Sequence, residues 1–260
     1  MIYHYTRENV IEALRKIGIE QGDSVFIHSN LGFLGMMEHC GTKEKLCEEF
    51  LGAVKEVTGE EGTIILPAFS YSFCHDEVYN PLETGTTCGM LSEYMIRHFG
   101  CNRSLDPNFS ICGMGKSMSY YRDCNVHEAF GEDSFWERLV KEGGKIMCVN
   151  FDAGSTLIHY IERLNHVAYR YNKAFNGIKI VDGKQVRDYA VHFVYDYDKP
   201  GDAYHPDRID ALCRENGIVK TAHLGKGSVL AFSAREYVDY IGELLKKRPR
   251  ILVKDEQEGA

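Results

Sequence analysis

A histidine and a glutamate three residues apart, His159 and Glu162, are the side chains of this 260-residue sequence best suited to do chemistry. Around them Leu157, Ile161 and Leu164 recur with helical spacing, which predicts a short amphipathic helix. The histidine and the glutamate lie on the polar side of that helix, where the carboxylate can orient the imidazole and stabilise its charge. An imidazole held in this way can take a proton from an amine or an alcohol near neutral pH. The pair therefore indicates general-base catalysis, and the plainer alternative is a solvated helix face.

The same two side chains could also supply two metal ligands, as in carboxylate di-iron bundles. Such sites need a second copy of the motif and further carboxylates on facing helices, and the sequence shows neither. It also lacks the glycine-rich phosphate loops and the Gly-x-Ser-x-Gly nucleophile elbow. We therefore expect no metal and none of these conventional sites.

A polar loop follows the first apolar strand, at a place where ligands commonly bind. It consists of His28, Ser29, Asn30 and Leu31, and doubly wound folds place their ligand crevices at such strand ends. Backbone N–H groups freed there can bind carbonyl or phosphate oxygens and could stabilise an oxyanion. An ordinary connecting loop is the alternative.

Two later segments combine positive charge with polar or aromatic side chains. In the irregular segment 103–110, Arg103 could pair with a phosphate, and Ser110 could bind a ligand or cap a backbone group. Residues 169–173, Tyr-Arg-Tyr-Asn-Lys, form an aromatic and basic cluster after the predicted helix. A solvated strand edge fits this cluster equally well.

The elements that must position these side chains follow an α/β pattern. Apolar strands alternate with amphipathic helices in the first two thirds of the chain, which predicts a βαβ unit with parallel strands. The expected helices are 10–17, 42–57, 88–99 and 134–140, and the expected strands are 24–28, 63–67 and 145–149.

The last third of the chain changes character. The dipeptide Asp182-Gly183 between two strand-like runs is a strong signal for a two-residue hairpin. Ser233 and Glu236 form a capping box that opens a final helix. The expected strands are 178–181, 185–195 and 227–232, and the final helix is 233–246.

The predicted fold class is therefore α/β, a mostly parallel central sheet flanked by helices with a small antiparallel embellishment in the C-terminal third. We find no repeat, no low-complexity segment and no linker. We therefore expect a single domain over residues 1–260, with an antiparallel insertion near 178–225.

Charge, apolar runs and cysteine pattern argue against two classes of partner, nucleic acids and membranes. The formal net charge of −8 at pH 7 argues against nucleic acid, which would need clustered Lys and Arg. No apolar run approaches the length of a membrane span. The nine cysteines contain no Cys-x-x-Cys pair, and the first residues lack the apolar core of a signal peptide. We expect free thiols in a cytoplasmic protein with neither nucleic acid nor membrane as partner, and a homo-oligomer stays open.

Five sequence blocks in a fixed order make the chain resemble the aminoglycoside 3-N-acetyltransferase family over roughly residues 7 to 245. The blocks are 22–31 with Gly35 behind it, 62–69, Arg103 and Ser104 with Pro107 and Ser110, Phe130 and Gly131 with Ser134, and 156–159 with Glu162. Each block is weak alone, and their order over one chain length makes the resemblance specific. Members of this family move an acetyl group from acetyl-CoA to an amine of an amino sugar.

The resemblance implies an α/β fold distinct from the more widespread acetyltransferase superfamily. It also implies His159 as the catalytic base with Glu162 as its partner, and an acetyl-CoA tunnel lined by the loops 28–31 and 103–110. The neutral amine would attack the thioester directly in a ternary complex, so no cysteine would take part. The cofactor-binding residues expected on this basis are His28, Ser29, Asn30, Leu31, Phe69, Arg103, Ser104 and Ser110.

Two departures from the family pattern bear on the acceptor. Many antibiotic-modifying members have His before the Pro of the third block, where this chain has Asp106. A polycationic antibiotic calls for carboxylates, whereas Arg170 and Lys173 would suit a phosphorylated acceptor. We therefore expect a nucleotide-linked dideoxyamino sugar used in surface glycan (O-antigen type) biosynthesis. The expected substrate-binding residues are Asp106, Tyr71, Tyr169, Arg170 and Lys173.

Three alternatives to this function stay open. The first is an aminoglycoside 3-N-acetyltransferase that confers antibiotic resistance. The second is a catalytically silent CoA-binding protein, which is disfavoured because a decayed site would be expected to lose His159 or Glu162. The third is a thiol-dependent acyl hydrolase that uses Cys112, near the third block. A short acyl group other than acetyl also stays open.

Overall fold

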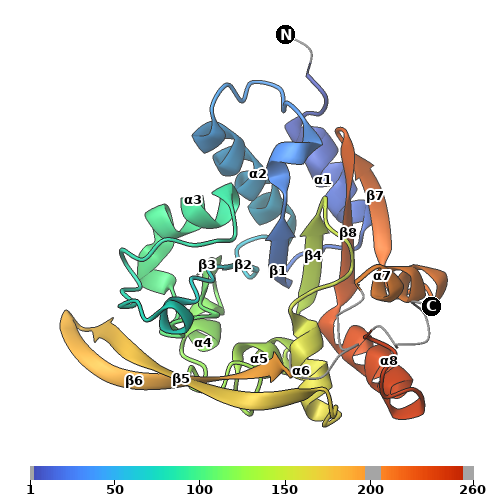
Figure 1. The fold of residues 1–260 in the computed structure, drawn as a ribbon. Coiled ribbons are helices and arrows are strands. Elements are labelled where there is room, and N and C mark those ends of the chain that lie inside the picture. The colour runs from blue at the N-terminus through green and yellow to red at the C-terminus, as the bar shows by residue number, and fades with distance from the viewer. Residues whose placement is uncertain (1–2, 197–205, 254–260) are drawn as a thin grey trace.

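The computed structural model describes residues 3–196 and 206–253, and Figure 1 shows the arrangement of the chain. The α-helices are α1 Arg7–Lys16, α2 Lys43–Thr58, α3 Met90–Phe99, α4 Met118–Arg122, α5 Phe135–Lys141, α6 Leu157–Leu164, α7 Pro206–Glu215 and α8 Ala234–Lys247. The strands are β1 Ser24–Ser29, β2 Thr63–Pro67, β3 Ile111–Gly115, β4 Lys145–Val149, β5 Arg170–Val181, β6 Lys184–Tyr195, β7 Lys220–Leu224 and β8 Gly227–Ser233. Short 3-10 turns are η1 Leu31–Leu34, η2 Ser72–His75 and η3 Gly100–Asn102.

The central sheet has the strand order β3-β2-β1-β4-β8-β7. Strand β1 pairs in parallel with β2 on one side and with β4 on the other. The remaining pairings, β2 with β3, β4 with β8 and β8 with β7, are antiparallel. The predicted α/β class with a parallel sheet centre is therefore confirmed, and antiparallel strands extend this centre at both edges.

Helices cover both faces of the sheet (Figure 1). Because side chains alternate along a strand, Phe26 of β1 faces a core shared with α5, α6 and α8, while Val25 and Ile27 face a core shared with α1, α2 and α3. Burial on both faces explains why the central strands have continuous apolar sequences. Within the described ranges 3–196 and 206–253, no helix is both long and apolar enough to cross a membrane.

Local capping decides where the first and last helices begin. The Thr6 hydroxyl accepts from the Asn9 backbone N–H, and the Asn9 side chain accepts from the Thr6 N–H, so α1 starts before the expected residue 10. At α8 the Ser233 hydroxyl accepts from the Glu236 N–H at 3.3 Å, which confirms the predicted cap.

Strand β3 was not expected from the sequence, because glycines interrupt it. A Cβ on Gly113 would lie 2.2 Å from the Ile64 carbonyl oxygen of β2, so the missing side chain is what lets the two strands pair closely. Helices α4 and α7 and strand β7 were also not expected. Strand β7 falls within the predicted insertion 178–225, but it belongs to the central sheet.

Strands β5 and β6 form a separate two-stranded ribbon that projects from the body near α6 (Figure 1). Val181 pairs with Lys184, so Asp182 and Gly183 make the turn, with positive φ angles of 50° and 73°. This is the predicted two-residue hairpin. The ribbon starts at Arg170, eight residues before the expected strand, and so takes in the basic cluster; residues 197–205 of the expected insertion lie outside the described residues.

Backbone hydrogen bonds attach both edges of the ribbon to the body. At the β5 edge, the Tyr79 N–H donates to the Ile178 carbonyl at 2.9 Å, and the Ile180 N–H donates to the Tyr79 carbonyl at 2.8 Å. At the β6 edge, the Val191 N–H donates to the His127 carbonyl at 2.7 Å. The ribbon is therefore fixed to the body along both edges.

Replacing Gly183 by Val should lower the free energy of unfolding by about 1–2 kcal/mol, because a β-branched residue is strained at positive φ. A Cβ at this position would meet nothing within 4 Å, so the cost is conformational. Gly41 also has open space around it and lacks a positive φ, so Gly41→Val should change stability by less than about 0.5 kcal/mol. Urea unfolding of both variants checks this, and equal losses would contradict the assignment of the turn.

Candidate active site

Helix α6 carries the histidine and the glutamate as predicted. Leu157 and Ile161 are buried against the sheet, and Leu164 at the end of the helix is half exposed. The His159 Nδ1 lies 3.0 Å from the Glu162 Oε2. Because Nδ1 faces the carboxylate, Nε2 is the nitrogen left to receive a proton from a substrate.

The burial of this dyad differs between its two members. The Glu162 side chain has no exposed surface, whereas 24% of the His159 side chain is exposed. Burial lowers the pKa of His159, the hydrogen bond to Glu162 partly offsets this, and the charge of Arg170 lowers the pKa further. The imidazole is therefore neutral at neutral pH and can act as a base.

The adjacent ends of β1 and β4 bring a second histidine close to α6. The His28 Nε2, at the end of β1, lies 3.0 Å from the Oγ of Ser155, in the loop that leads from β4 into the helix. Burial lowers the pKa of His28 to about 4, so this ring is neutral as well. Ser155 was not among the expected site residues, although it lies four residues before His159 in the sequence, a spacing that places both on one helical face.

The backbone N–H groups of Asn30 and Leu31, in the loop 28–31, form hydrogen bonds within the protein. The Asn30 N–H donates to the Val149 carbonyl at 2.9 Å, and the Leu31 N–H donates to the Ser29 hydroxyl at 3.2 Å. These two N–H groups therefore do not form the expected oxyanion site. The loop does lie beside the segment that opens α6, since Asn30 Nδ2 also donates to the Asn150 carbonyl at 3.4 Å.

Aromatic rings connect two other predicted residues to the dyad. Phe69 and Tyr71 each pack edge to face against Phe109, with ring centroids 5.1 and 5.3 Å apart. Phe109 packs in the same way against Phe130 at 5.1 Å, and Phe130 against His159 at 5.3 Å. The structure thus joins Phe69 and Tyr71 to the catalytic candidate through apolar contacts.

Arg170, expected to bind a phosphate, lies inside the protein instead. Its Nε is 2.6 Å from the Glu162 Oε2, and 4% of its side chain is exposed. Its Nη1 donates to the Phe193 carbonyl at 2.9 Å, and its guanidinium stacks on the ring of Tyr195 at 3.5 Å. This buried anionic partner argues against the expected phosphate contact of Arg170.

The neighbours of Arg170 divide between the interior and the surface. Tyr169 is buried, and burial together with the charge of Glu162 raises the pKa of its hydroxyl. Tyr169 is therefore part of the support of the dyad and does not present a polar face to solvent. Lys173 is exposed on β5, with its Nζ 5.0 Å from the centre of the Phe175 ring.

Arg103 also has a structural role in place of the expected phosphate contact. Its Nε donates to the Ser110 hydroxyl at 3.1 Å, and its Nη2 donates to the Ala68 and Gly85 carbonyls at 2.6 and 3.1 Å. Its Nη1 donates to the Thr84 carbonyl. The buried guanidinium therefore ties three chain segments together, and these contacts use four of its five N–H groups.

The other predicted residues of the segment 103–110 are internal too. The Ser104 hydroxyl accepts from the Ile111 N–H at 3.0 Å, and the Ser110 hydroxyl donates to the Ala68 carbonyl at 2.6 Å. Asp106 accepts from the N–H groups of the two residues at 108 and 109, at 2.9 and 2.8 Å, and burial raises its pKa to about 6. These contacts shape the loop, so the polar groups of Ser104, Asp106 and Ser110 have partners within the protein.

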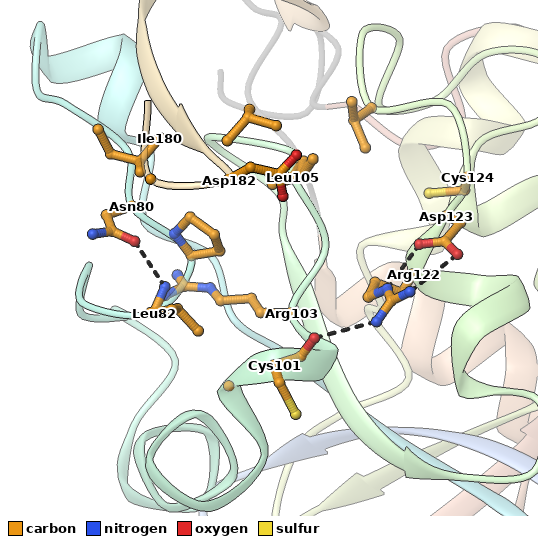
Figure 2. Close-up of a pocket in the computed structure, with 15 residues that line it drawn as sticks. Asn80, Leu82, Cys101, Arg103, Leu105, Arg122, Asp123, Cys124, Ile180 and Asp182 are labelled. Carbon is orange, nitrogen blue, oxygen red and sulfur yellow. Dashed lines mark hydrogen bonds and ion pairs between the residues drawn. The ribbon is translucent and has the colours of Figure 1, made fainter. Parts of the chain in front are cut away.

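A cavity of about 620 Å³ lies between the ribbon turn and the loops around it (Figure 2). Its lining includes Leu82, Leu105 and Arg122. The Arg122 guanidinium donates to the carboxylate of its neighbour Asp123 and to the Cys101 carbonyl. His159 and His28 are not among the lining residues, so we do not place the reacting groups there.

Cysteine chemistry does not fit this site. All nine cysteines are free thiols, as expected. Cys112 is buried with its Sγ 3.3 Å from the Phe99 carbonyl, and burial raises the pKa of the thiol to about 12. A thiol that stays protonated is a poor nucleophile, which argues against the hydrolase alternative. In the part of the chain that the structure describes, no three His, Cys, Asp or Glu side chains are grouped to hold a metal ion.

Replacing Arg103 by Met should lower the free energy of unfolding by about 3 kcal/mol, because several buried carbonyls lose their donor. Arg122, which lines the same cavity with a third of its side chain exposed, offers a matched control, and Arg122→Met should cost less than about 1 kcal/mol. Urea unfolding gives both values. A small loss for Arg103→Met together with a raised KM for acetyl-CoA would restore its role as a phosphate ligand.

Curated relatives of this chain are acetyltransferases by name. Aminoglycoside N(3)-acetyltransferase III of a Salmonella species is 26% identical over 178 residues, which covers 61% of this chain and 60% of that protein. The chain thus spans less than two thirds of this relative. Aminoglycoside N(3)-acetyltransferase VII of Streptomyces paromomycinus is 25% identical over 267 residues, which covers 90% of this chain and 89% of that protein. These names agree with the predicted enzyme class.

Solved structures share the fold. The apoenzyme of aminoglycoside acetyltransferase AAC(3)-IVa has a TM-score of 0.78 at 20% identity, over 100% of this chain and 95% of that chain. AAC-IIIb in a binary complex with CoASH has a TM-score of 0.78 at 18% identity, over 94% of this chain and 97% of that chain.

These relatives correct the acceptor expected from the sequence. They are named for aminoglycosides, whereas the expected acceptor was a nucleotide-linked dideoxyamino sugar. That expectation depended on Asp106 and on Arg170 and Lys173 as phosphate ligands, and the structure buries Arg170 against Glu162. The nucleotide-sugar hypothesis is therefore wrong, and its aminoglycoside alternative is the better supported one.

The family itself is defined by a sequence model described as aminoglycoside 3-N-acetyltransferase, which matches residues 26–246. This range holds β1, the loop 28–31, the segment 103–110 and the whole of α6 with its dyad. The match covers most of the chain and agrees with the resemblance seen in the five sequence blocks. The chain belongs to the aminoglycoside 3-N-acetyltransferase family.

Proposed function

We propose that this protein transfers the acetyl group of acetyl-CoA to the 3-amino group of an aminoglycoside. The observation that carries the proposal is the dyad of His159 and Glu162, held 3.0 Å apart on α6 beside the ends of the parallel strands. Family membership gives the reaction class, and the dyad gives this chain a base with which to perform it.

The chemistry follows from the protonation states at the site. An aminoglycoside amine is mostly an ammonium at neutral pH and cannot attack until it loses a proton. The neutral Nε2 of His159 accepts that proton, while Glu162 holds Nδ1 and stabilises the imidazolium. The new C–N bond then forms at the thioester carbonyl as the C–S bond breaks. The proton on His159 goes to the departing thiolate, which returns the ring to its neutral form. The second proton on the attacking nitrogen is released to solvent, so the products are the neutral amide and the CoA thiol.

Acetyl-CoA as cosubstrate is supported by AAC-IIIb, a neighbour of the same fold described with bound CoASH. An aminoglycoside acceptor is supported by AAC-VIa, a further neighbour described with bound sisomicin. The formal charge of −8 on this chain also favours the approach of a polycation. We propose His28 and the aromatic series from Phe69 to Phe130 as the walls next to the reacting atoms.

Release of free thiol from acetyl-CoA tests this function. The acceptors are gentamicin, sisomicin and kanamycin, and mass spectrometry and NMR of the product locate the acetylated nitrogen. The proposal predicts thiol release that depends on the acceptor, with acetylation at the 3-amino group. CoA binding without acceptor-dependent release would contradict it and would favour a catalytically silent protein.

His159→Asn should lower kcat by about 10²–10⁴, the usual contribution of a general base, and leave the Kd for CoA nearly unchanged. His166→Asn is the matched control, because His166 is exposed at the end of the same helix and its φ of 50° suits asparagine. Its kcat should stay within about twofold of the parent. A threefold or smaller loss in His159→Asn would remove this residue from the mechanism.

A further inference from the structure

Arg170 is a buried cation that sits at the inner side of the dyad. As a whole residue it is 8% exposed, and its partners come from α6 and β6. The Glu162 carboxylate on α6 lies 2.6 Å from its Nε, and β6 contributes the Phe193 carbonyl and the ring face of Tyr195. A cation so enclosed is stable only when it is paired, and the anion it pairs with is the one that holds His159.

One carboxylate oxygen serves both of its neighbours. The Glu162 Oε2 is 3.0 Å from the His159 Nδ1 and 2.6 Å from the Arg170 Nε. The guanidinium therefore fixes the position of that oxygen and neutralises part of its charge. Both effects reach the imidazole, the first through geometry and the second through electrostatics.

We propose that Arg170 is a positioning residue of the acetyl-transfer site, which holds Glu162 ionised and aimed at His159 and thereby sets the pH range in which His159 works as a base. This inference rests on the proposed function of the dyad. It assigns Arg170 to the catalytic support of the enzyme, in place of the acceptor contact expected from the sequence.

The charge balance of the buried group explains the direction of the effect. With neutral His159, the three side chains of His159, Glu162 and Arg170 have no net charge, and one added proton makes the buried group positive. Without Arg170, the same group starts negative, and one added proton makes it neutral. Burial favours the neutral state, so the His159–Glu162 pair binds its proton more tightly when Arg170 is absent, whichever atom carries that proton.

Among the described residues, the titratable neighbours of this network include Tyr169, Tyr195, Arg163 and His166, and the last two line a hollow together with Arg170. Tyr169, next to Arg170 in the chain, is within electrostatic reach of Glu162, and Tyr195 on β6 covers the guanidinium. Arg163 on α6 pairs with Glu128 at 2.5 Å, and both of their side chains are partly exposed. Arg163 therefore provides a matched arginine on the dyad's own helix whose partner is not the dyad.

The test compares Arg170→Gln, Arg170→Lys and Arg163→Gln with the parent protein. Two quantities are measured: the pH profile of kcat/KM with gentamicin, and the NMR titration of the His159 imidazole, assigned by its loss in His159→Asn. In Arg170→Gln the acid limb and the imidazole titration should both move to higher pH by about one unit. Arg170→Lys keeps the positive charge but loses the planar guanidinium group. We therefore expect kcat to fall while the acid limb of the pH profile moves by less than about 0.3 pH unit. Arg163→Gln should change neither quantity.

A uniform loss of kcat/KM at every pH in Arg170→Gln, with the imidazole titration unmoved, would overturn the proposal and leave Arg170 as a structural residue. Should Arg170→Gln fail to fold, Arg170→Lys still decides: an unchanged kcat, or an acid limb that moves by more than about 0.3 unit, would overturn the proposal. A shifted titration in a protein that transfers no acetyl group would instead reject the proposed function and keep the positioning role.

Discussion

A carboxylate with no exposed surface needs a cation beside it, and the pairing of Glu162 with Arg170 is the constraint on which the rest of the site depends. Without that cation, the buried carboxylate would lack its paired charge, which is costly in the protein interior. Helix α6 supplies the carboxylate and the imidazole three residues apart, and β5 supplies the cation. The working site therefore exists only where the helix and the ribbon pack together.

The ribbon beside α6 is best understood as the support of this ion pair. Arg170 lies at its base, opposite Tyr195 in the register of β5 and β6, and that tyrosine covers the guanidinium. Hydrogen bonds through Tyr79 and His127 fix both edges of the ribbon to the body.

The local geometry that the sequence predicted correctly depends on spacing along the chain. His159 and Glu162 share one helix turn, and Asp182 with Gly183 fits a two-residue turn, so neither needs knowledge of the tertiary fold. The partners of Arg103 and Arg170 could not be predicted, because an arginine suits a phosphate, a carbonyl cluster and a carboxylate equally well, and only packing decides among them. The contact of His28 with Ser155, 127 residues apart, has no local signal.

The most direct test of this account is a double-mutant cycle between Glu162 and Arg170, measured in kcat/KM with Glu162→Gln, Arg170→Gln and the double variant. If the two residues act as one unit, the double variant should be no worse than Glu162→Gln alone, because neither buried charge is then left unpaired. The coupling free energy should be about 2 kcal/mol or more. Losses that add within about 0.5 kcal/mol would contradict the account, because they would show that the dyad functions without its buried arginine.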